Sequence, residues 1–133
     1  MKRVFYLFLL AGISFCCKKE AVSPTSQPGN SVFFKDNNLV VSNFTATPEQ
    51  DGSIEVNFLT QILGNVSKVE LMSGENTNTF CTIYILPLQS NSAIQAFSFD
   101  DSHPKGNPVY YMIRYQLADG SFGGFSPVYK QSF

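Results

Sequence analysis

Groups that commonly carry catalysis are scarce in this chain of 133 residues, which lacks tryptophan and contains a single histidine, His103. One imidazole cannot complete the ligand set of a zinc site, and the spacings typical of such sites are absent. His103 lies in the polar stretch 100–107, which predicts a solvated loop residue. Cys81 lies in an apolar stretch and is expected to be buried and inert. We therefore expect no catalytic residue, no metal site, no cofactor and no enzyme activity.

Charge is also sparse, because charged residues make up only 14% of the chain and the formal net charge is −1. This balance gives no reason to expect a nucleic-acid partner. Asp100, Asp101 and Asn107 offer oxygen atoms that calcium could use, but a solvated turn is the preferred interpretation of this loop. Stretches with helical periodicity are almost absent, whereas thirteen Phe, six Tyr and nine Gly favour an all-β chain.

The chain begins with the basic residues Lys2 and Arg3, followed by an apolar run over residues 4–15. A run of this length is too short to span a bilayer, which takes about twenty residues. A basic start and a short apolar run are typical of a secretory signal peptide, expected here over residues 1–16. The alternatives are a plain cleaved signal without lipid and an uncleaved anchor.

The end of this segment, Ile13-Ser14-Phe15-Cys16-Cys17, resembles the lipobox of bacterial lipoproteins. In that family a cysteine becomes the first mature residue and carries the acyl chains, which attach the protein to the membrane. Cys17 is the preferred acceptor because the small Cys16 precedes it, whereas the bulky Phe15 precedes Cys16, the alternative.

The next residues, Lys18-Lys19-Glu20, resemble an export signal used by one group of Gram-negative bacteria. The resemblance implies an outer-membrane lipoprotein exposed at the cell surface, with a periplasm-facing lipoprotein as the alternative. Residues 17–38 are rich in Ser, Pro, Gln, Gly and Asn and are expected to form a disordered tether. Val32-Phe33-Phe34 interrupts this composition, and it either folds back onto the domain edge or forms an exposed docking patch.

The remaining residues, 39–133, alternate between apolar and polar side chains in short runs separated by turn signals. The clearest alternation places Ile54, Val56 and Phe58 on one face of a strand. In the segment 109–117, Val, Tyr, Ile, Tyr and Leu alternate with Tyr, Met, Arg and Gln, and Asp119-Gly120 follows as a tight turn. The predicted strands cover residues 39–47, 53–60, 66–71, 80–86, 93–99, 109–117 and 125–129. About seven short strands predict an antiparallel, immunoglobulin-like β-sandwich.

Two stretches in this domain carry a further resemblance. The run from Tyr111 to Tyr115, with Asp119-Gly120 and Ser126-Pro127-Val128 after it, resembles the last two strands of a fibronectin type III domain. Residues 54–58 resemble its second strand, with Phe58 where the family usually has tryptophan. The resemblance implies that Tyr111 is the structural tyrosine of this family, with its ring in the core and its hydroxyl hydrogen-bonded to backbone at a corner.

With no chemistry in the sequence, binding is the expected function. Residues 120–125 read as a flexible loop that carries Phe122 and Phe125 at one end of the sandwich, where recognition is often located. These rings either contact a ligand or cap the core. Tyr110, on the outward face of its strand, is the third candidate for ligand binding. The prediction is a membrane-anchored, non-catalytic binding module for glycan or an envelope protein. The alternative is a structural spacer or assembly subunit without a ligand.

Overall fold

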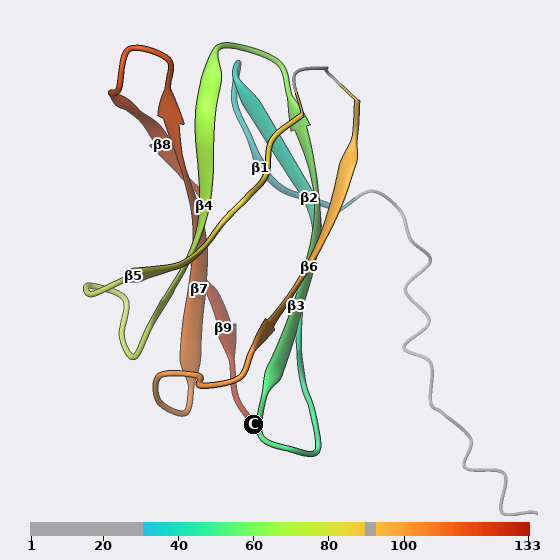
Figure 1. Cartoon of the computed structure of the whole chain (residues 1–133). Coiled ribbons are helices and arrows are strands. Elements are labelled where there is room, and N and C mark those ends of the chain that lie inside the picture. Colours follow the sequence, from blue (N-terminus) through green and yellow to red (C-terminus); the bar gives the residue numbers. More distant parts are fainter. Residues whose placement is uncertain (1–30, 90–92) are drawn as a thin grey trace, which may run out of the picture.

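The computed structural model describes residues 31–89 and 93–133, so the predicted signal peptide (1–16), Cys16, Cys17 and most of the predicted tether lie outside the described residues. The described part is all-β and forms two antiparallel sheets packed face to face, as Figure 1 shows. For the described residues, this confirms the prediction of an all-β fold with the layers of a β-sandwich. No helix suited to crossing a membrane occurs in the described ranges.

Each sheet combines strands that are distant in sequence. The first sheet has the order β1-β2-β3-β6 and contains β1 (Val32–Lys35), β2 (Leu39–Pro48), β3 (Ile54–Ile62) and β6 (Gln95–Asp101). The second has the order β5-β4-β7-β8 and contains β5 (Cys81–Ile85), β4 (Val66–Gly74), β7 (Val109–Leu117) and β8 (Phe122–Phe125). β9 (Tyr129–Gln131) also pairs with β7.

The core forms between the sheets from alternate residues of β3 and β7. The inward positions predicted for β3 are all buried, and on β7 the same holds for four of the five predicted positions, with Leu117 partly buried. Phe58 lies between Phe44 and Phe97, with ring centroids 5.5 and 5.7 Å away. Period-two alternation therefore placed the correct side chains in the core, because one face of each strand is covered by the other sheet.

Strand β1 lies within residues 17–38, the segment predicted to be a disordered tether, so the ordered domain begins earlier than residue 39. Phe33 of β1 stacks on Phe44 with ring centroids 4.6 Å apart, and Phe34 lies against Tyr115. The Tyr115 hydroxyl donates a hydrogen bond to Asp36 and accepts one from Asn38. Of the two interpretations of residues 32–34, folding back onto the domain edge is the one observed, because two aromatic rings find partners there.

The final hairpin returns in two pieces, whereas a single strand over residues 125–129 was predicted. The turn itself forms as expected, with Gly120 at φ +86° and its N–H donating to Leu117 O. Between β8 and β9, the Ile113 N–H donates to Ser126 Oγ at 2.8 Å. In a continuous strand pair, a backbone carbonyl would accept this hydrogen bond instead. Pro127 follows and has no N–H to donate, so the ladder is interrupted there.

Cys81 is exposed, so the prediction of a buried cysteine is wrong. It is the first residue of β5, an outermost strand that pairs with β4 on one side only. The register between the two strands shifts at Leu71 and Met72 of β4. An apolar run can be buried on both faces only where other layers cover both, and β5 has no such cover. The sequence of the run does not distinguish a central strand from an edge strand.

Candidate binding surface

The outer face of the sheet formed by β5, β4, β7, β8 and β9 brings together charged and aromatic side chains from β4, β7, β8 and β9. Along β7 the outward positions alternate with the buried ones, and each lies beside an outward residue of β4. Glu70 pairs with Arg114, Lys68 with Gln116, and Met72 with Met112. The register of β4 against β7 therefore assembles this face from residues forty or more positions apart.

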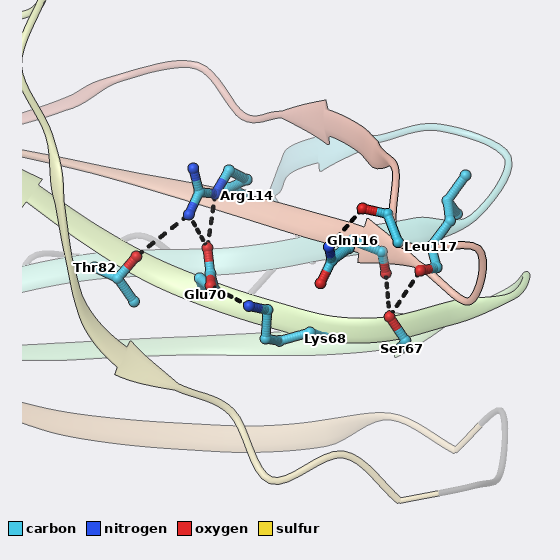
Figure 2. Close-up of polar contacts among 8 residues, drawn as sticks. Ser67, Lys68, Glu70, Thr82, Arg114, Gln116 and Leu117 are labelled. Atoms are coloured by element: carbon cyan, nitrogen blue, oxygen red, sulfur yellow. Dashed lines mark hydrogen bonds and ion pairs between the residues drawn. The ribbon is translucent and has the colours of Figure 1, made fainter.

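Glu70 lies at the centre of an ion-pair network, which Figure 2 shows. Its carboxylate accepts hydrogen bonds from Arg114 Nε at 2.6 Å and forms an ion pair with Lys68 Nζ at 2.8 Å. Arg114 also reaches Thr82 Oγ1 on β5 at 3.5 Å. Glu70 is only 4% exposed although it points away from the core. The network holds the long Arg114 side chain in one orientation across the sheet.

The pKa of Glu70 lies below its ordinary value despite this burial. Burial by itself raises the pKa of a carboxyl, but the hydrogen bonds from Lys68 and Arg114, with their positive charges, outweigh that effect. Glu70 is therefore a carboxylate at neutral pH, and its charge is compensated by two cations.

The Arg114 guanidinium lies over the ring of Phe122, 4.3 Å from its centroid, in a cation–π arrangement. Phe125 lies next to Phe122, with ring centroids 6.4 Å apart. The two side chains are 52% and 53% exposed. Of the two interpretations of these rings, capping the core is not what the structure shows. Together Phe122, Phe125 and Arg114 form an exposed cluster, called the aromatic cluster below.

Both rings point outward because β8 contains a register irregularity. Arg114 lies opposite Phe125, Tyr115 opposite Gly124, and Gln116 opposite Phe122, so Gly123 is skipped. A Cβ at Gly123 would overlap the ring of Tyr115, which fills the space beneath β8. Glycine is thus required there by the core, and the skipped residue turns two Phe residues three positions apart to the same side. Residues 122–125 are a strand, whereas the sequence predicted a flexible loop.

Of the predicted site residues, the structure brings Phe122 and Phe125 together but does not join Tyr110 to them. Tyr110 is outward-facing and partly buried, near the other end of β7, opposite Gly74 and Lys130. Sequence reasoning missed the roles of Arg114 and Glu70. Their only signal was opposite charge at outward positions of two strands, and it becomes informative only once β4 and β7 are known to be neighbours.

The face is also electrostatically distinct from the rest of the described domain. Three of the five described cations, Lys68, Arg114 and Lys130, lie at its outward positions with one carboxylate, which gives a net charge of +2. The other two cations are outnumbered by eight carboxylates elsewhere, a net charge of −6. A partner that carries negative charge is therefore attracted to this face and repelled by the others.

Tyr111 has a buried ring, but its hydroxyl donates to Asp101 Oδ2 at 2.7 Å rather than to backbone, which the family resemblance had implied. Burial and then this hydrogen bond to a carboxylate raise the pKa of Tyr111 well above its ordinary value. Asp101 belongs to β6 and also accepts the His103 N–H, while Asn107 bonds to Phe133. Two of the three calcium candidates, Asp101 and Asn107, are thus used in structural contacts.

Other polar groups of the described residues do not converge on a reactive centre. His103 is exposed, and its Nδ1 lies 2.9 Å from Ser102 Oγ. An open hollow of about 580 Å³ at one end of the sandwich is lined by Glu49, Asp51, Glu55 and Asp100. Asp51 accepts hydrogen bonds from Ser53, and no set of three or more His, Cys, Asp or Glu in residues 31–89 and 93–133 is grouped to hold a metal ion.

No family model, no curated protein and no solved structure matches the chain.

Proposed function

We propose that this chain is an envelope lipoprotein whose fibronectin type III-like domain is a non-catalytic protein-binding module. Cys17, or alternatively Cys16, carries the lipid, and the outer membrane is the expected location. The sheet order supports the domain type, because β2, β3 and β6 lie side by side in one layer and β5, β4, β7 and β8 lie side by side in the other. The function is assigned to the aromatic cluster, because the fold by itself does not specify one.

The observation that carries the proposal is the paired exposure of Phe122 and Phe125 beside Arg114. Aromatic and arginine side chains are enriched among the residues that dominate protein–protein binding energy. Here Glu70 and Thr82 hold Arg114 in place, so little side-chain freedom remains to be lost when a partner binds. A domain that acted only as a spacer would have no use for two adjacent half-exposed Phe rings.

A protein partner fits this face better than a glycan does. Sugar recognition needs polar side chains that are free to hydrogen-bond hydroxyl groups beside the aromatic ring. Around Phe122, Arg114 is engaged by Glu70, and the Gln116 amide donates to Gly120 O. An apolar centre surrounded by satisfied polar groups resembles the core and rim of a protein interface.

The size and charge of the face indicate the kind of partner. Four strands about 4.8 Å apart and up to nine residues long give a face of roughly 14 by 30 Å. Such an area lies at the lower end for specific complexes, which favours a transient interaction. The net charge of +2 favours a partner surface with apolar side chains flanked by Asp or Glu.

Site-specific photo-cross-linking in intact cells tests the proposal. A photoreactive phenylalanine at position 122 should give a defined cross-linked adduct. The control position is Phe133, the C-terminal residue, whose side chain is 47% exposed. The same photoreactive residue at position 133 should not give that adduct. With the adduct identified and purified, Phe122→Ala should weaken binding roughly 30-fold, as expected for a buried aromatic anchor. Phe133→Ala is the matched control and should leave binding unchanged.

Two outcomes would overturn the proposal. Equal adducts at both positions would show that position 122 has no specific partner. Binding of a purified envelope polysaccharide that Phe122→Ala abolishes, without any protein adduct, would assign the face to glycan. Protease treatment of intact cells separately tests the location: cleavage within residues 31–133 from outside supports surface display, and protection supports the periplasm-facing alternative.

A further inference from the structure

The outermost strands of the two sheets differ in how well they are protected from pairing with another chain. β1, β5 and β8 have four or five residues, and each has a register irregularity against its neighbour. Short length and bulges are the features by which proteins prevent pairing at exposed edges. β6 has neither, because its seven residues pair with β3 in one continuous register.

The composition of β6 leaves its edge open as well. Gln95–Asp101 contains no Pro, Gly, Lys or Arg, and among the described strands β3 is the one hydrogen-bonded to it. Of its two carboxylates, that of Asp101 is bonded to Tyr111. Alternate residues of an edge strand direct N–H and C=O groups outward, so β6, the last strand in its sheet, directs a row of backbone groups away from β3.

Open space lies beside the first half of this edge. A hollow of about 460 Å³ is lined by residues 95–98 of β6 on one side and by Tyr84 and Pro87 on the other. Beyond Ser98, Tyr84 stacks on Phe99, with ring centroids 5.0 Å apart. Phe97 and Phe99, the inward-facing aromatics of β6, are only partly covered. A strand added here would cover apolar surface and satisfy backbone groups at the same time.

The sequence of β6 is complementary to itself in the antiparallel direction. The strand has Ser98 at its centre, so full overlap with a second copy places Ser98 opposite Ser98 of that copy. Phe97 then lies opposite Phe99 of the second copy, a favourable aromatic pair on the core side. Ala96 lies opposite Asp100 and Gln95 opposite Asp101, so no like charges face each other. The two core faces also fall on the same side of the joined sheet.

We propose that β6 is a self-association edge, at which two copies of this chain pair their β6 strands antiparallel about Ser98. The pairing joins the two β1-β2-β3-β6 sheets into one continuous sheet across a two-fold axis. It leaves the aromatic cluster free, because that cluster lies on the outer face of the other sheet. Seven paired residues make a small contact, so the dimer is dynamic and depends on local concentration.

Disulfide cross-linking of the full chain in intact cells tests this register. The exposed Cys81 is first replaced by serine, and Ser98→Cys is introduced. Directly opposite residues have Cα atoms about 4.5 or 5.5 Å apart, within the range that a disulfide spans. Ser98→Cys should therefore yield roughly tenfold more cross-linked dimer than Ala118→Cys, the matched control on the exposed hairpin turn. Labelling with a maleimide confirms that both thiols are accessible.

A second set of variants keeps the test informative if Ser98→Cys perturbs the strand. The combination Ala96→Cys with Asp100→Cys should cross-link, whereas Ala96→Cys by itself should not, because two copies of residue 96 lie about 13 Å apart in this register. Adding Ser98→Lys to the combined variant should reduce the dimer, since two ammonium groups then face each other. The monomer should tolerate this lysine, because Glu55 already bonds to Ser98.

Cross-linking at position 98 that does not exceed that at position 118, with both thiols labelled, would overturn the proposal. Cross-linking of position 98 to a different protein would also overturn it and would assign the edge to a foreign strand. Cross-linking at position 96 as strong as at position 98 would show contact without the proposed register. Because Phe122→Ala acts on the other sheet, it should leave the cross-linked dimer unchanged.

Discussion

Arg114→Met is the most informative single change to the face, because Arg114 belongs both to the ion-pair network and to the aromatic cluster. Breaking a buried ion pair by removing one partner typically costs about 3–5 kcal/mol. Here Lys68 stays bound to Glu70 and Arg114 is partly exposed, so we expect about 2 kcal/mol of lost folding stability. The cost comes from a Glu70 carboxylate left with one cation in a position almost closed to solvent.

Chemical denaturation with urea measures this effect in a double-mutant cycle. Glu70→Leu should cost about 1 kcal/mol, because Arg114 can then extend into solvent, and the double variant should cost less than the two single variants together. Lys68→Met is the control and should cost less than about 1 kcal/mol, since Arg114 still pairs with Glu70. Additive effects, or a cost for Arg114→Met below about 0.5 kcal/mol, would refute the argument that the burial of Glu70 depends on Arg114.

The same pair predicts the response to acid. The folded-state pKa of Glu70 is lowered from its ordinary value of 4.5, so its stabilising contribution is complete above that pH. It is lost as the pH falls below 4.5 and Glu70 becomes protonated. Glu70→Leu should therefore lose less stability than the wild-type chain on acidification below pH 4.5. Parallel acid curves for the two proteins would contradict the lowered pKa.

Two further changes test contacts of the core. Tyr111→Phe should cost about 2 kcal/mol in urea denaturation, because it removes a hydrogen bond to a buried carboxylate. Because the pKa of Tyr111 is raised in the folded state, its contribution to stability is complete below pH 10 and decreases above that pH. The wild-type chain should therefore lose more stability than Tyr111→Phe in alkaline solution. Equal losses for the two proteins would contradict the raised pKa. Gly123→Ala should cost at least about 2 kcal/mol in the same assay, because its Cβ overlaps the Tyr115 ring, and a cost near zero would show that the ring can move.

The sequence predicted well those features that local periodicity determines. The bounds expected for the strand 109–117 are the bounds observed for β7, and the predicted inward residues of β3 are buried. A period of two identifies a strand with one covered face, whatever its partners are. The Asp119-Gly120 turn was equally local, since it depends on the positive φ that glycine allows.

Features that depend on distant partners could not be predicted in this way. β1 forms because Phe33 meets Phe44 and Phe34 meets Tyr115, contacts that composition does not reveal. The exposure of Cys81 follows from the position of β5 at a sheet edge. Glu70 pairs with Arg114 because β4 and β7 are adjacent strands of one sheet. Each of these is decided by the order of strands, which the sequence pattern left open.

The aromatic cluster shows why its geometry was the hardest feature to foresee. Strict alternation would place Phe122 and Phe125, three residues apart, on opposite faces of β8. Their shared face results from the residue skipped at Gly123, and glycine is needed there because Tyr115 occupies the space beneath it. Tyr115 is in turn held by Asp36 of the β1–β2 turn. The exposed surface is therefore a consequence of core packing, so a substitution at Gly123 alters both folding and the surface, whereas one at Phe122 alters the surface without touching Tyr115.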